Sequence, residues 1–162
     1  MNQVLLCGLA LIATLGATAP EPSGQTPVTP VSVDSPTVTL VMQREARTGE
    51  PVPIALRATN ATERPLTLYL RGRPVTFDLV VAGTDGTVLW RRLAGAVISM
   101  VLQVRTLAPG EALEFKDTWK QTTKAGRVPP GDYVVTGQLP TDGPRPFVTP
   151  SVALRILPPA GR

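Results

Sequence analysis

The chain has 162 residues, of which 43% are hydrophobic and 17% charged, a composition typical of one globular domain with additional non-core segments. Histidine is absent and Cys7 is the only cysteine, which excludes His-based catalysis, the commonest zinc sites, CxxC sites and intramolecular disulfides. We therefore expect a non-catalytic protein with no cofactor and no metal. Thirteen of the sixteen cations are arginines dispersed along the chain, so the net charge of +4 does not predict nucleic-acid binding.

An apolar run of fourteen residues extends from Val4 to Ala17 and ends in small residues. This is the layout of a secretory signal peptide over residues 1–19, with an A-x-A pattern at Ala17 to Ala19. The run is too short for a membrane anchor, which needs about 20 apolar residues. We expect secretion or export to the periplasm or cell envelope, with cleavage after Ala19 or Ala17 and no membrane span in the mature protein.

Residues 20–36 are rich in Pro, Ser and Thr and show neither helical nor strand periodicity. This composition favours an extended, polyproline-like linker. We expect the linker to precede a single folded domain over residues 37–158.

Short segments in which apolar and polar residues alternate follow the linker. A period of two predicts half-buried β-strands. The predicted inward positions, apart from the tryptophans treated below, are Val38, Leu40, Met42, Ile54, Leu56, Ala58, Leu66, Leu68, Leu70, Phe77, Leu79, Val81, Val88, Leu113, Phe115, Tyr133, Val135, Leu139, Val152, Leu154 and Ile156.

Turn residues separate these segments. The pair Asp85-Gly86 predicts a β-hairpin, because the glycine supplies the positive φ of a tight return. Pro109-Gly110 and Pro130-Gly131 predict two further turns. Eight or nine short strands with no amphipathic helix predict an all-β protein with a Greek-key sandwich.

Three aromatic residues have positions that indicate structural roles. Trp90 and Trp119 lie on the apolar phases of their segments, so we expect both in the core. Tyr133 follows a Pro-Gly turn, where a tyrosine of a β-sandwich commonly donates its hydroxyl to the backbone.

The segment from Leu93 to Met100 is a first candidate for partner binding, with Ile98 and Met100 as contact residues. It is apolar except for Gly95 and Ser99, so it is either a buried crossover between sheets or an exposed recognition loop. An exposed apolar run of this length would favour aggregation, so we expect the segment to be buried.

A second candidate is the loop from Thr141 to Pro150, which is polar and contains Pro144, Pro146 and Pro150. Prolines make a loop rigid, and a rigid loop loses less entropy when it docks into a partner. Arg145 would present a basic side chain, and trypsin-like enzymes cleave poorly before the proline that follows it. The alternative is an ordinary hairpin loop.

A set of landmarks in a fixed order resembles the BsuPI domain family, named for a Bacillus intracellular proteinase inhibitor. The resemblance covers roughly Val38 to Pro140. The landmarks are Phe77-Asp78-Leu79-Val80-Val81, Asp85-Gly86, Val88-Leu89-Trp90-Arg91, Leu107-Ala108-Pro109-Gly110-Glu111, Phe115, Trp119 and Gly126-Arg127-Val128-Pro129-Pro130-Gly131-Asp132-Tyr133. The resemblance implies an immunoglobulin-like antiparallel β-sandwich in a bacterial exported module.

The same resemblance implies a protein partner, with a proteinase as the candidate. This chain departs from the family pattern after Arg91, where Ile98 stands in place of an aromatic residue. We expect a monomer that inhibits a proteinase reversibly by docking a loop. The alternative is an immunoglobulin-like interaction module of the bacterial envelope without inhibitory activity.

Overall fold

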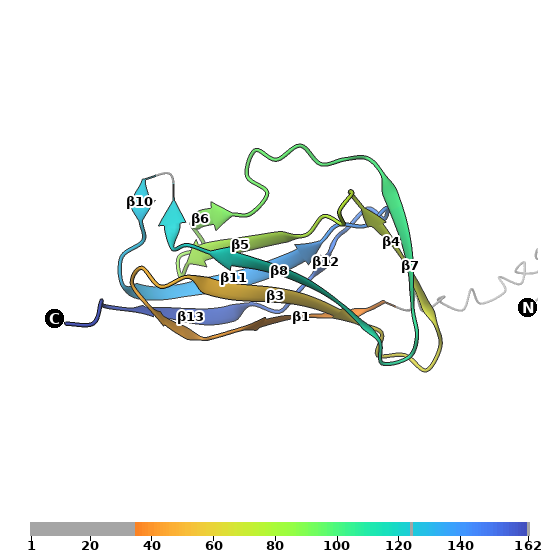
Figure 1. Ribbon diagram of the computed structural model, residues 1–162, viewed down its shortest axis with the longest axis horizontal. Helices are drawn as coiled ribbons and strands as arrows, with labels where there is room; N and C mark the ends of the chain where they lie inside the picture. The colour runs from red at the N-terminus through yellow and green to blue at the C-terminus, as the bar shows by residue number, and fades with distance from the viewer. Residues whose placement is uncertain (1–34, 124, 162) are drawn as a thin grey trace, which may run out of the picture. The chain divides into compact units, whose positions relative to one another are not determined.

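Thirteen strands and no helix occur in the residues that the computed structural model describes, 35–123 and 125–161 (Figure 1). Nine strands have four or more residues, close to the number predicted, and the other four have two or three. The strands are β1 (Thr37–Met42), β2 (Glu45–Arg47), β3 (Val52–Thr59), β4 (Leu66–Arg71), β5 (Asp78–Gly83), β6 (Val88–Arg91), β7 (Leu102–Leu107), β8 (Ala112–Trp119), β9 (Thr122–Thr123), β10 (Gly126–Arg127), β11 (Gly131–Leu139), β12 (Phe147–Val148) and β13 (Val152–Leu157). The predicted signal peptide and residues 20–34 of the predicted linker lie outside the described residues.

Most of the long strands form two sheets that pack face to face. One sheet has the order β1-β3-β8, and the other has the order β2-β13-β11-β5-β6 with β12 also paired to β11. A Cβ atom placed on Gly137 of β11 would lie 2.9 Å from Leu56 Cδ1 of β3 and 3.0 Å from Leu40 Cδ2 of β1. The sheets are therefore in direct contact at Gly137, and the predicted all-β sandwich is confirmed.

The strands β4 and β7 form a separate two-stranded ribbon. Because β3 leads into β4 and β7 leads into β8, the ribbon continues the β3–β8 pair beyond the sandwich. Figure 1 shows it crossing the end of the sandwich at a steep angle to the other strands.

Asn60 holds the bend between the β3–β8 pair and the ribbon. Its buried side-chain amide donates to Leu107 O at 3.0 Å and to Arg64 O at 2.8 Å. Its Oδ1 accepts from Thr62 N at 3.0 Å. All the hydrogen-bonding groups of a buried amide are thus used to fix the corner.

The predicted inward positions make up most of the core. Buried among them are Val38, Ile54, Leu56, Ala58, Leu66, Leu68, Leu70, Phe77, Leu79, Val81, Tyr133, Val135, Leu139, Leu154 and Ile156. Five others, Leu40, Met42, Leu113, Phe115 and Val152, are only partly buried. Val88 of β6 is 58% exposed, so the alternation is wrong there. In most of the other long strands it predicts correctly which face packs inward.

The two tryptophans differ in burial. Trp119 is 1% exposed, so its predicted place in the core is confirmed. Trp90 is half-buried and packs against Trp119 at the margin of the core, with ring centroids 6.4 Å apart. The expectation that both are core residues is thus correct for Trp119 and too strong for Trp90, because β6 is the last strand of its sheet.

Tyr133 joins the start of β11 to the turn before it. Its hydroxyl donates to Pro129 O at 2.5 Å, as predicted from its place after the Pro-Gly turn. Burial raises the pKa of the Tyr133 phenol above its ordinary value.

The hairpin between β5 and β6 has the predicted turn. Gly86 has φ +84°, Gly86 N donates to Gly83 O at 3.0 Å, and Gly83 N donates to Thr87 O at 2.9 Å. Four residues, 84–87, connect the strands, and the glycine among them takes the left-handed conformation that a tight hairpin requires.

Candidate functional site

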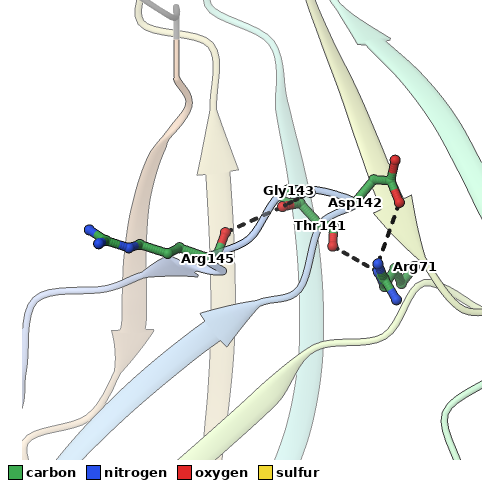
Figure 2. A network of polar contacts seen from close by, with 5 residues as sticks. All are labelled: Arg71, Thr141, Asp142, Gly143 and Arg145. Atoms are coloured by element: carbon green, nitrogen blue, oxygen red, sulfur yellow. Dashed lines mark hydrogen bonds and ion pairs between the residues drawn. The ribbon is translucent and has the colours of Figure 1, made fainter.

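The loop from Thr141 to Pro146 is held in place by Arg71 of β4 (Figure 2). Arg71 Nε donates to Thr141 O at 2.9 Å, and Arg71 Nη2 lies 3.4 Å from Asp142 Oδ1. Asp142 N donates to Tyr69 O at 3.0 Å, which ties the loop to the edge of β4 through the backbone as well.

Thr141 also organises the loop from within. Its Oγ1 accepts from Gly143 N at 3.1 Å and donates to Arg145 O at 3.4 Å. These bonds close a turn across the exposed residues, in the manner of a side chain that replaces a backbone turn. The loop conformation is therefore fixed by hydrogen bonds as well as by proline.

The structure narrows this candidate to residues 141–146. Phe147 and Val148 form β12 and pair with β11, and Phe147 packs against the core. Thr149 is buried, and its Oγ1 accepts from Gly137 N at 2.9 Å. The last part of the predicted loop, 147–149, thus belongs to the sheet, and alternation is too short over two residues to reveal it.

Pro144, Arg145 and Pro146 are exposed at the tip of this loop. In Figure 2 the Arg145 side chain extends away from the polar network around Thr141. It forms no ion pair and no side-chain hydrogen bond with the residues that the structure describes. A fixed loop therefore presents an unpaired cation between two prolines.

In the segment from Leu93 to Met100, residues 94–100 are exposed, contrary to our expectation that the segment is buried. Val97 is 99% exposed and Met100 is 80% exposed, and Ile98 is also on the surface. The segment connects β6 to β7 outside both sheets (Figure 1). Hydrophobic composition alone suggested burial, but the residues show no strand periodicity that would place them in a sheet.

Two arginines fasten the start of this segment to β5 and β8. Arg91 Nε lies 2.5 Å from the buried carboxylate of Asp78, whose other oxygen accepts from Leu93 N at 3.1 Å. Arg92 Nε lies 2.6 Å from Asp117 Oδ2, and its guanidinium stacks 3.9 Å from the centre of the Phe77 ring. The exposed apolar residues therefore begin at a rigid point.

The first candidate segment lies beside the residue that precedes the loop 141–146. Ile98 and Pro140 line the same open hollow of about 340 Å³, together with Asp78 and Gln138. A second hollow of about 450 Å³ is lined by Thr141 to Gly143 of the loop and by Thr67 and Tyr69 of β4. Arg145 and Met100 line neither of these hollows.

The sequence analysis did not predict two ion pairs that hold the candidate segments, Arg71 with Asp142 and Asp78 with Arg91. Arg71 and Asp142 are 71 positions apart, and Asp78 and Arg91 are 13 apart. Opposite charges at such separations carry no local periodicity, so a single sequence offers no signal for pairing them.

The described residues were compared with the side-chain clusters that hold metal ions and with helices that span membranes. Residues 35–123 and 125–161 contain no set of three or more Asp, Glu, His or Cys side chains placed to hold a metal ion. Within the same residues no helix is long and apolar enough to span a membrane.

Comparison with solved structures gives matches of low sequence identity and low TM-score. The CARDB domain of a Pyrococcus furiosus protein is 10% identical with a TM-score of 0.41, and the match covers 83% of this chain and 100% of that one. An alkylpurine DNA glycosylase from Pseudomonas fluorescens is 11% identical with a TM-score of 0.38, covering 74% of this chain and 29% of that one. A β-glucosidase from Listeria innocua is 10% identical with a TM-score of 0.37, covering 75% and 16%. These similarities say nothing of ligands or activity.

Sequence comparison identifies the family. No curated protein matches the chain. The family BsuPI, described as an intracellular proteinase inhibitor, matches residues 39–143, which is more than half of the chain. The matched residues include the hairpin at Gly86 and the residues Thr141 and Asp142 that Arg71 contacts. The chain therefore belongs to the BsuPI family, as the order of its landmarks indicated.

Proposed function

We propose that this protein is a reversible proteinase inhibitor that docks the loop 141–146 into its target. Membership of the BsuPI family supports a proteinase as the partner. The observation that carries the proposal is the exposed Arg145 on a loop fixed by Arg71 and Thr141. A fixed loop loses little conformational entropy on binding, so more of the contact energy remains as affinity.

The charge of Arg145 indicates the class of proteinase. Trypsin-like serine proteinases bind a basic side chain in a pocket that holds an acidic group. Pro146 follows Arg145, and a proline after the basic residue slows cleavage of that bond. We therefore infer inhibition without turnover of the loop, at enzymes that prefer a basic residue.

A panel of trypsin-like, chymotrypsin-like and metalloproteinases, assayed with the purified protein, tests the proposal. Inhibition should be confined to the trypsin-like enzymes and should be lost in Arg145→Ala. Arg57→Ala is the matched control, because Arg57 is exposed on β3 and its removal changes the net charge equally. Inhibition that is equal in the two variants would exclude Arg145 as the contact.

We also infer that the chain is exported. The apolar run from Val4 to Ala17 supports export, and removal of the segment that contains Cys7 would leave a mature protein without thiols, which suits an oxidising compartment. N-terminal sequencing of the protein from periplasmic and culture fractions tests this. A mature N-terminus near Thr18 or Pro20 is expected, and an intact Met1 in the cytoplasmic fraction would contradict export.

A further inference from the structure

The outer face of the β4–β7 ribbon carries a stripe of exposed apolar side chains. Tyr69 and Val104 lie directly opposite each other in the register, and Leu102 is two residues away on the same face. These three side chains are 42 to 57% exposed. Single exposed hydrophobic residues are ordinary, but a contiguous group on one face indicates an interaction surface.

The strand β7 has an unpaired edge beside this stripe. Its strand partner among the described residues is β4 alone. Gly72 N donates to Val101 O at 2.8 Å, so these residues form a hydrogen-bonded pair, and such pairs alternate with non-hydrogen-bonded pairs along an antiparallel ladder. By this register the N–H and C=O groups of Leu102, Val104 and Thr106 point away from β4.

A contact on the opposite side of β4 supports this register. Tyr69 pairs with Val104, and Tyr69 O accepts from Asp142 N, which lies on the side of β4 away from β7. The Tyr69–Val104 pair is therefore non-hydrogen-bonded, as the alternation requires. The edge of β7 thus offers backbone donors and acceptors at three alternate residues.

The surroundings of this edge are basic. Residues 66–77 and 93–107 contain no Asp or Glu, but they contain Arg71, Arg73 and Arg105. Arg71 is paired with Asp142, whereas neither Arg73 nor Arg105 forms an ion pair with a described residue. Arg105 is exposed on β7 itself, one residue from Val104 and so on the opposite face of the strand.

We propose that the edge of β7 binds an extended segment of a partner protein in which apolar and acidic side chains alternate. In an added strand, successive side chains point to opposite faces. The apolar side chains pack beside Leu102, Val104 and Tyr69, and the acidic side chains lie on the face of Arg105. A second copy of this chain is the poorer occupant, because its edge would bring another Arg105 and no acidic side chain.

This surface is distinct from the loop 141–146, and the inference does not depend on proteinase inhibition. A direct binding assay tests it. The probes are two fluorescent eight-residue peptides, one of alternating valine and glutamate and one of alternating valine and lysine. Fluorescence anisotropy with the purified protein should show at least about tenfold tighter binding of the glutamate peptide, because opposite charges select the partner.

Three variants separate strand addition from non-specific adhesion. Thr106→Pro removes one outward N–H without removing a bond of the β4–β7 ladder, since edge strands accept proline where the N–H faces solvent. Thr106→Val is its control, because it keeps the N–H and loses only the hydroxyl contact with Thr67. Thr106→Pro should weaken binding of the glutamate peptide at least about fivefold and Thr106→Val should not. Arg105→Glu replaces an exposed side chain and should make the protein prefer the lysine peptide.

The proposal is overturned if both peptides bind alike or neither binds, if Arg105→Glu leaves the preference unchanged, or if a folded Thr106→Pro binds as Thr106→Val does. Sedimentation of the parent protein as a dimer and of Thr106→Pro as a monomer would also overturn it, because a second copy would then occupy the edge.

Discussion

Arg71 and Asp142 are separated by 71 positions in the sequence, and their side chains meet at 3.4 Å where the loop 141–146 leaves the sheet. The same guanidinium donates to Thr141 O at 2.9 Å. Both side chains are partly open to solvent, so the pair contributes little to global stability. Its consequence is the fixed position of the loop that presents Arg145.

Arg71→Ala should release the loop while the protein remains folded. We expect a loss of at most about 1 kcal/mol in the free energy of unfolding, because exposed ion pairs are worth little. Inhibition of a trypsin-like target should weaken roughly tenfold through lost preorganisation. Asp142→Asn, which removes the charge but leaves the Arg71–Thr141 bond, is the control and should change inhibition less. Equal inhibition by Arg71→Ala and the parent protein would show that the contacts of Arg71 with Thr141 and Asp142 have no role in inhibition.

Asn60→Ala should destabilise the protein by roughly 2 to 4 kcal/mol. The substitution removes the Asn60 donors to Leu107 O and Arg64 O and the acceptor of Thr62 N. Urea unfolding followed by tryptophan fluorescence measures the loss. Glu63→Ala, in the same exposed turn, should be close to neutral.

Gly137→Ala tests the contact between the two sheets. The added methyl would lie 2.9 Å from Leu56 Cδ1 and 3.0 Å from Leu40 Cδ2, so we expect a cost of about 1–3 kcal/mol from overpacking. Gly161→Ala is the control, because no atom lies within 4 Å of the corresponding methyl. Equal melting temperatures for the two variants would mean that the sheets are not packed at Gly137.

Trp119→Ala should cost about 3–5 kcal/mol, as large-to-small changes at buried aromatic residues do. Trp90→Ala should cost clearly less, because Trp90 is half-buried at the end of its sheet. Chemical denaturation of both variants, followed by circular dichroism, gives the comparison. A larger loss for Trp90→Ala would reverse the assignment of the two residues.

The raised pKa of Tyr133 predicts that the free energy of unfolding falls at alkaline pH. Burial raises the pKa of the folded phenol above its ordinary value of 10, so the unfolded chain ionises first as the pH rises. The stabilisation is complete below pH 10 and declines above it. Tyr133→Phe loses the bond to Pro129 O, at a cost of about 1 kcal/mol near neutral pH. The difference between parent and Tyr133→Phe should therefore shrink above pH 10. Tyr69→Phe, at an exposed tyrosine, should show no such trend.

The alternation of the sequence was sufficient to predict the sandwich and most of its core, because strand burial follows a period of two. It did not predict that β3 and β8 continue into a separate ribbon, since that bend depends on buried hydrogen bonds from Asn60 to residues distant in the sequence. The exposure of Val97 and Met100 was also missed. Hydrophobicity gives a preference for burial, but without periodicity it does not tell which layer is available to bury a segment.

The central claim is that the loop 141–146 presents Arg145 to a proteinase. The most direct measurement is the inhibition constant of the purified protein against a trypsin-like enzyme before and after exchange of residues 142–146 for a Gly-Ser segment of equal length. We predict that the exchange abolishes inhibition and leaves the melting temperature nearly unchanged, because these residues are exposed and contribute little to the core. Inhibition that survives the exchange with an unaltered constant would contradict the claim.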